Sequence, residues 1–159
     1  MMLHESPQTA AELEAELAPL ILPHFDETTA FHLGSILVRR AQEGRMPVII
    51  NIRGANRTFF HAALPGSAAT NDNWARRKSN TVLMIGKASL VIGRKYAEIG
   101  RSLDSDGLPA ADYTDSGGAV PLMVWGVGMV AVCTVSGLPQ VEDHKLVVAG
   151  LRELLAYLA

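Results

Sequence analysis

The sequence predicts an α+β fold in which helices pack against an antiparallel β-sheet. The first observation behind this prediction is that residues 116–141 carry no charged side chain. A membrane-spanning helix needs about 20 consecutive apolar residues, but glycines and prolines interrupt this stretch, and its many β-branched residues favour strands. Two apolar runs, 119–125 and 129–135, flank a Gly-Val-Gly turn and predict a buried hairpin. The second observation is an earlier pair of alternating runs, with helical patterns before, between and after the two pairs.

Two helices are expected in the N-terminal part of the chain. Residues 9–22 place leucines at helical spacing, and Pro23 is expected to end this helix. A second helix should begin at Asp26 or Thr28, which are both good N-cap residues, and end at Gly44.

The next two elements are predicted to be strands. Residues 46–53 and 57–64 alternate in polarity, and a short turn at 54–56 joins them. The alternation places His61 on the same face as Phe59.

The second half of the chain adds three helices and the uncharged hairpin. Residues 70–72 offer N-cap chemistry for one helix, and Ser89 for another that ends near Gly100. Residues 101–118 form the longest irregular loop, and Pro139 introduces the last helix after the hairpin. Four strands are therefore read clearly.

Composition limits the classes of protein that this chain can be. Its 159 residues are the size of a single domain. A net charge of −2, from 14 basic and 16 acidic residues, argues against nucleic-acid or membrane binding. Charged residues make up only 19% and apolar residues 48%, which suggests surface buried against other copies of the chain.

The location is expected to be cytoplasmic. The only cysteine, Cys133, lies within an apolar run, so no internal disulfide can form, and a packed core residue is expected there. Residues 1–8 lack the basic region and the apolar segment of a secretory signal.

Two blocks of sequence carry a resemblance to a known family. Residues 60–66 (FHAALPG) lead to 73–78 (NWARRK), and Gly117-Gly118 lead to 134–144 (TVSGLPQVEDH). In these blocks, and over nearly its whole length, the chain resembles the haem-degrading domain superfamily of GlcG/HbpS-like proteins, in particular its cytoplasmic branch. The resemblance implies one domain over residues 1–159, with a five-stranded, profilin-like antiparallel sheet flanked by helices. It also implies a homo-oligomer, and haem is the cofactor that it suggests.

Among the candidate site residues, the histidines are of most interest. The five histidines lack the paired spacing of a metal site, so no metal centre is predicted. His61 is expected to share a sheet face with Asn51 and Arg53, and it is a better axial haem ligand than Cys133, whose thiolate would be costly inside an apolar strand. His144 follows two acidic residues that suit the positive end of the last helix. For both histidines a structural or interface role is the alternative.

The remaining candidates could hold an anionic ligand. Trp74, Arg77 and Lys78 fall on nearly one helical face and would present an indole beside two cations. Alternatively, the indole anchors the core or an interface while the cations are solvated or pair with acids. Gly117 and Gly118 would allow a ligand to approach the backbone closely.

Three classes of function follow. The leading hypothesis is an oligomeric small-molecule-binding protein whose ligand is haem or another anionic compound, held near the residues just named. The second is an enzyme acting on haem or a small carboxylate with His61 or His144 transferring protons, although no catalytic motif identifies a reaction. The third is an oligomeric adaptor or assembly protein.

Overall fold

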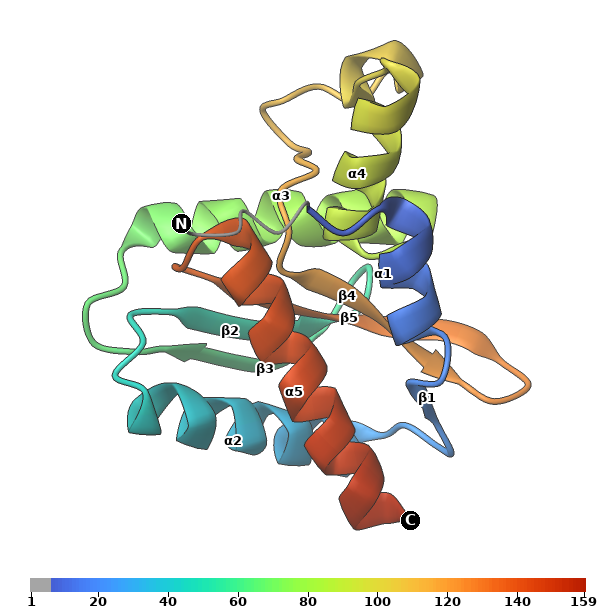
Figure 1. The fold of residues 1–159 in the computed structure, drawn as a ribbon. Helices are drawn as coiled ribbons and strands as arrows, with labels where there is room; N and C mark the ends of the chain where they lie inside the picture. Colours follow the sequence, from blue (N-terminus) through green and yellow to red (C-terminus); the bar gives the residue numbers. More distant parts are fainter. Residues whose placement is uncertain (1–6) are drawn as a thin grey trace, which may run out of the picture.

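The computed structural model describes residues 7–159 and contains one five-stranded sheet with helices on both faces (Figure 1). The residues behind the expectation about a targeting signal lie mostly outside this range. In chain order the elements are α1 (Ala10–Leu17), β1 (Ile21–Leu22), α2 (Glu27–Glu43), β2 (Ile49–Arg53), β3 (Thr58–Ala63), α3 (Ala69–Ile85), α4 (Ser89–Ile99), the 3₁₀ helix η1 (Leu103–Asp106), β4 (Ala119–Val124), β5 (Gly128–Ser136) and α5 (Gln140–Leu158).

Both predicted hairpins are confirmed. The strands lie in the order β1-β4-β5-β2-β3, and β5 pairs antiparallel with both β4 and β2. The turn between β4 and β5 requires left-handed backbone at Gly126 and Gly128, with φ of 73° and 102°, which explains the glycines in the turn. Cys133 is fully buried in β5, and burial raises the pKa of its thiol.

The sheet is mixed, so the prediction of a purely antiparallel sheet was wrong. The fifth strand is β1, which runs parallel to β4 and pairs Ile21 with Met123. The sequence predicts that Ile21 and Leu22 belong to the first helix, but that helix ends at Leu17. Pro19 is the physical reason, since a proline has no backbone N–H to donate to the carbonyl four residues earlier, and its ring clashes with that carbonyl.

The helices divide between the two faces of the sheet. Helix α3 covers one face, while α2 and α5 pack side by side on the other, where they enclose the main core with the apolar side of the sheet (Figure 1). Gly34 in α2 makes this packing close, because a Cβ there would lie 2.4 Å from the Phe60 ring of β3.

Three of the predicted helix ends are confirmed: both ends of α2 and the C-terminal end of α4. Asp26 caps α2 by accepting a hydrogen bond from the Thr29 amide, and Gly44 and Gly100 end α2 and α4. The N-caps predicted for α3 and α4 were wrong. Helix α3 begins after Ala68, and Ser89 instead uses its hydroxyl to accept a hydrogen bond from the Ala119 amide of β4.

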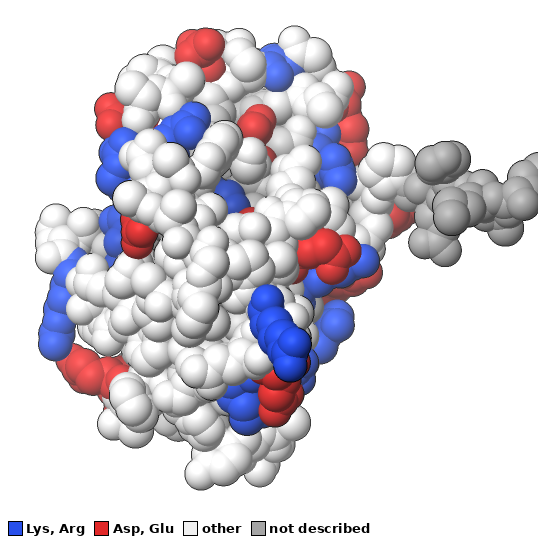
Figure 2. Space-filling model, turned by 90° about the vertical axis from the view of Figure 1, so that its left-hand side faces the viewer, with Lys and Arg blue, Asp and Glu red and all other residues white. Residues whose placement is uncertain are grey.

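Several large apolar side chains are exposed on the surface. Charged groups surround an extended uncharged area on the face drawn in Figure 2. Among the large apolar side chains of residues 7–159, the most exposed are Phe31, Trp125, Val127 and Tyr157, each with 65–71% of its surface accessible. None of the helices in residues 7–159 is long and apolar enough to cross a membrane.

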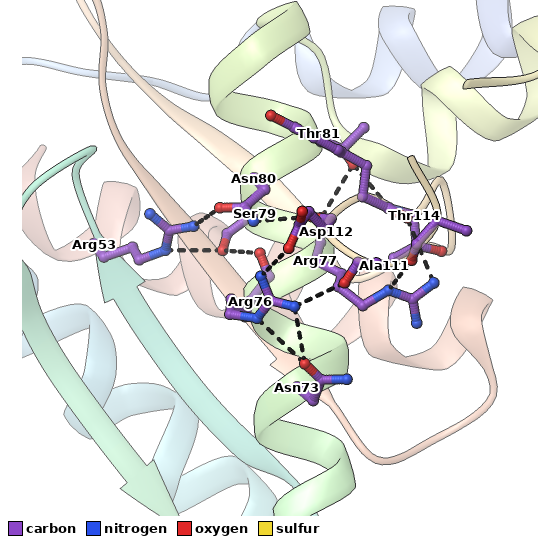
Figure 3. Close-up of polar contacts among 12 residues, drawn as sticks. Arg53, Asn73, Arg76, Arg77, Ser79, Asn80, Thr81, Ala111, Asp112 and Thr114 are labelled. Carbon is purple, nitrogen blue, oxygen red and sulfur yellow. Dashed lines mark hydrogen bonds and ion pairs between the residues drawn. The ribbon is translucent and has the colours of Figure 1, made fainter. Parts of the chain in front are cut away.

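The irregular segment 101–118 is held against α3. Figure 3 shows Arg76 and Arg77 reaching from α3 to this segment, where they donate hydrogen bonds to the carbonyls of Ala111 and Ala110 at 2.8 Å. The side-chain amide of Asn80 donates to the Asp112 carbonyl at 2.9 Å. Side chains of α3 thus satisfy backbone carbonyls of this segment that no regular secondary structure pairs.

Candidate functional site

A cavity with a volume of about 800 Å³ lies among α1, α4 and α5. This volume falls within the range of small-molecule sites, roughly 300–1,000 Å³. Its apolar walls come from all three helices and consist of Leu13, Leu90, Val141 and Val148. Its polar groups are Gln8, Glu16, Arg94, His144, Lys145 and Arg152.

His144 is a buried polar residue in the lining of this cavity. The residue is 3% exposed, and its Nδ1 has no hydrogen-bond partner in the described part of the chain. Burial lowers the pKa of His144 to about 4, although the nearby charge of Glu16 acts in the opposite direction. The imidazole is therefore neutral at physiological pH, which is the form that binds metal ions.

Arg94 of α4 brings a second unsatisfied group to the same cavity. Its Nε is buried and has no hydrogen-bond partner among the described residues. Lys145 and Arg152 add two exposed cations, whereas Glu16 is the only carboxylate that residues 7–159 bring to the lining, and it accepts a hydrogen bond from Gln8 at 2.6 Å. Positive charge therefore predominates around an apolar interior.

A buried ion pair fixes the beginning of α5 next to this cavity. Lys78 Nζ lies 2.9 Å from Asp143 Oδ2, and the two side chains are 4% and 1% exposed. Lys78 also donates to the Val135 carbonyl of β5 at 3.3 Å, and Asp143 accepts from the Leu138 amide at 2.9 Å. Burial raises the pKa of Asp143 and lowers that of Lys78, while each partner's charge opposes that effect. The pair ties α3, β5 and α5 together, and His144 follows Asp143 directly in the chain.

The two glycines lie close to this ion pair. Gly118 has φ of 131°, and a Cβ on it would lie 2.4 Å from the Val135 carbonyl oxygen and 2.9 Å from Lys78 Nζ. The Gly117 amide donates to the side chain of Gln140 at the start of α5. Close packing against Lys78 and α5 thus explains both glycines without a ligand.

Trp74 and Arg77 stack on each other at the surface. The Arg77 guanidinium lies 4.5 Å from the centre of the indole, a cation–π contact. The tryptophan is 40% exposed and, together with Lys78, lines a smaller cavity of about 230 Å³. Arg77 turns toward segment 101–118 and donates to the Ala110 carbonyl, whereas Lys78 pairs with Asp143 (Figure 3).

His61 lies elsewhere, on the sheet face that α3 covers. Its Nδ1 is 3.1 Å from Asn51 Nδ2, and its Nε2 is 3.0 Å from a carboxylate oxygen of Asp72. The predicted neighbourhood with Asn51 and Arg53 is correct, but the one with Phe59 is wrong. A β-bulge at this point of the hairpin lets Phe59 pack against Phe25 and the main core instead.

The candidate residues therefore divide among three places rather than forming one site. Lys78 forms the ion pair, with Gly117, Gly118 and Trp74 near it and Arg77 stacked on Trp74. His61 faces α3, and His144 lines the large cavity. Sequence reasoning missed Arg94, although a signal existed. Leu90 and Arg94 are four residues apart in α4, as are His144, Val148 and Arg152 in α5, so each set shares one helical face.

The architecture defines the class of the protein: an α+β protein with a mixed five-stranded sheet covered by helices on both faces. Within this class the chain belongs to the family described as haem degrading protein HbpS-like, whose profile matches residues 25–152. The chain is 45% identical to a UPF0303 protein of Streptomyces coelicolor over 92% of this chain and 94% of that protein. It is 42% identical to a UPF0303 protein of Streptomyces avermitilis over 94% and 92%.

Solved structures share the fold. The crystal structure of Ybr137w superposes with a TM-score of 0.84 at 29% identity, over 92% of this chain and 89% of that one. A complex of PduOC with haem gives a TM-score of 0.69 at 18% identity, over 80% and 93%. Streptomyces reticuli HbpS, solved as a double mutant, gives 0.68 at 20% identity, over 82% and 87%. At the identities of the last two, the likeness concerns the fold alone.

Proposed function

We propose that this protein binds haem, or another planar anionic molecule, in the cavity among α1, α4 and α5. The observation that carries the proposal is that His144 and Arg94 both line this one cavity, and that His144 Nδ1 and Arg94 Nε are buried without a hydrogen-bond partner among the described residues. Buried polar groups normally have a partner, and a ligand would supply one.

The residues of the cavity fit the chemistry of haem. A neutral imidazole such as His144 is a common axial ligand of haem iron, and the leucine and valine walls suit the macrocycle. Arg94 and Arg152 can bind the two propionates, because guanidinium groups bind carboxylates with charge-assisted hydrogen bonds. Bound haem would supply redox chemistry, while the protein would orient it and exclude water. The family and the haem complex of PduOC support this choice of ligand.

Haem titration followed by Soret absorbance tests the proposal. The wild-type protein should give a bound-haem band, His144→Ala should lose it, and Arg94→Gln should weaken binding without moving the band. His61→Ala is the matched control, because both ring nitrogens of His61 already have partners. His144→Met guards against a folding defect, since methionine fills the space and can ligate iron, so the band should move rather than vanish.

Two results would contradict the proposal. One is a wild-type protein without a Soret shift, which would favour the adaptor alternative. The other is loss of the band in His61→Ala but not in His144→Ala. Adding a reductant to the complex then separates binding from catalysis, because a band that decays with turnover indicates an enzyme that degrades haem.

We also propose that residues 7–159 form one domain that assembles with copies of itself in the cytoplasm. The exposed apolar side chains Phe31, Trp125, Val127 and Tyr157 support assembly, since large exposed apolar areas often mark interfaces. The single buried cysteine suits a reducing compartment. Sedimentation at micromolar concentration should give a mass above that of the 17.0 kDa chain, and a pure monomer would refute the assembly.

A further inference from the structure

A second, smaller cavity lies between the β2–β3 hairpin and α3, away from the proposed haem site. It has a volume of about 200 Å³ and is lined by Asn51, Arg53, His61, Asp72, Arg76 and Ser79, together with Ala75. Its residues come from both hairpin strands and from α3, so the framework that holds them is regular structure rather than loop.

Arg53 is the unusual group in this cavity. Its guanidinium is half-buried, and it donates to the Ser79 hydroxyl at 2.9 Å and to Asn80 Oδ1 at 2.5 Å (Figure 3). It also donates to the Gly54 carbonyl at 3.2 Å. All three acceptors are neutral, and no carboxylate of residues 7–159 forms an ion pair with Arg53. A partly desolvated cation without a counter-charge is costly.

The surroundings increase this imbalance of charge. Burial, and then the charge of Arg76, lower the pKa of Arg53. Arg76 itself is paired, since it contacts Asp112 at 3.0 Å and donates to Asn73 and Ala111 (Figure 3). Arg53 is therefore the cation of this lining that forms no ion pair within residues 7–159.

Hydrogen-bond donors remain free for a ligand. A guanidinium has five N–H groups, and the three contacts of Arg53 leave two of them without a partner in residues 7–159. Asn51 uses one amide hydrogen on His61 Nδ1 and keeps the other. An imidazole with its proton on Nε2 satisfies both Asn51 and Asp72, so His61 holds these two residues in place without being a ligand itself.

We propose that this cavity binds a small monocarboxylate, held by the free N–H groups of Arg53 and Asn51. A guanidinium matches the geometry of a carboxylate, and one negative charge balances the one unpaired cation. The carboxylate of Asp72, which is 45% exposed, lies in the lining and repels a second negative charge. The cavity therefore selects a monoanion over a phosphate dianion. This site is independent of haem binding.

Nuclear magnetic resonance of arginine Nε–H groups tests the proposal directly. Acetate is titrated into the intact protein at constant ionic strength, with chloride and inorganic phosphate as comparisons. The Arg53 signal should shift and saturate with acetate, and phosphate should bind more weakly. Arg53→Gln should weaken acetate binding at least ~10-fold, because a neutral amide replaces a charge-assisted donor. Arg57→Gln is the matched control, since Arg57 lies in the turn of the same hairpin but is exposed and paired with Glu27.

A second variant keeps the test decisive if Arg53→Gln folds poorly. Asp72→Asn removes the neighbouring carboxylate and should strengthen acetate binding several-fold while reducing the preference over phosphate. An Arg53 signal that does not respond to acetate in the wild-type protein would overturn the proposal. Equal affinity for phosphate and acetate would overturn the assignment of a monoanion, and unchanged affinity in Arg53→Gln would show that acetate binds elsewhere.

Discussion

The buried Lys78–Asp143 pair gives the sharpest test of how the fold is held together. Asp143→Ala would leave the Lys78 ammonium buried with only the Val135 carbonyl, at 3.3 Å, as a partner, and would leave the Leu138 amide without its acceptor. Removing one partner of a buried pair typically costs about 3–5 kcal/mol. The additional unsatisfied amide, worth about 1–3 kcal/mol, places the expected loss in the upper part of that range.

A double-mutant cycle separates the pair from its surroundings. Lys78→Met replaces the charge with an apolar chain of similar length and should cost about 3 kcal/mol, because the Asp143 carboxylate then stays buried with amide donors alone. In Lys78→Met/Asp143→Leu no buried charge remains. The double variant should therefore lose less stability than the sum of Lys78→Met and Asp143→Leu, with a coupling energy of about 2 kcal/mol or more.

Urea unfolding followed by circular dichroism at pH 7 measures these free energies. All variants must be compared at one protein concentration, because assembly would contribute to apparent stability. Glu27→Ala is the surface control, since it removes the exposed partner of Arg57 and should change stability little. If Asp143→Ala costs less than about 1 kcal/mol and the cycle is additive, the pair does not anchor α5 and the reasoning fails.

Three further outcomes are expected. The pKa of His144 is about 4 in the folded protein against 6.5 ordinarily, so the unfolded chain takes up the proton first as pH falls. The free energy of unfolding should therefore decrease by up to ~3 kcal/mol between pH 6.5 and pH 4. In urea unfolding, His144→Gln should flatten this dependence on pH. Gly118→Ala should cost about 1–3 kcal/mol or more in the same unfolding assay, because the backbone is left-handed and the space is filled; an unchanged midpoint would count against this packing. Trp74→Ala should cost no more than ~2 kcal/mol, below the value for a buried tryptophan, because the ring is 40% exposed; calorimetry showing a larger loss would indicate that an interface covers it.

The hairpins could be predicted from the sequence because their signal is local and repeated. Alternation over several residues and glycines in the turn identify β4 and β5 whatever packs on them. Strand β1 could not be predicted, since two residues show no alternation and its partner Met123 lies about a hundred residues away. The β-bulge that turns Phe59 to the core leaves no mark in the alternation either.

The candidate site could be predicted only in part, for a related reason. The motifs pointed to Lys78 and His144, but pattern alone could not show that Lys78 is buried against Asp143, which lies 65 residues further along the chain. The sequence suggested that Asp143 serves the positive end of α5, whereas its main contact is an ion pair with Lys78 of α3. The large cavity arises from the packing of α1, α4 and α5, so Arg94 had no visible connection to His144 before the fold was known.

The adjacency of Asp143 and His144 links stability to the proposed function. Successive residues of a helix point in directions about a quarter turn or more apart, so one turn of α5 can serve two surroundings. Asp143 lies on the side of α3 and β5, where Lys78 holds it, and His144 enters the cavity beside α1 and α4. A helix start fixed by a buried ion pair has little freedom to rotate, and this rigidity holds an otherwise unpartnered imidazole in place. The same residues that carry the family resemblance thus act as an anchor on one side of α5 and present the proposed iron ligand on the other.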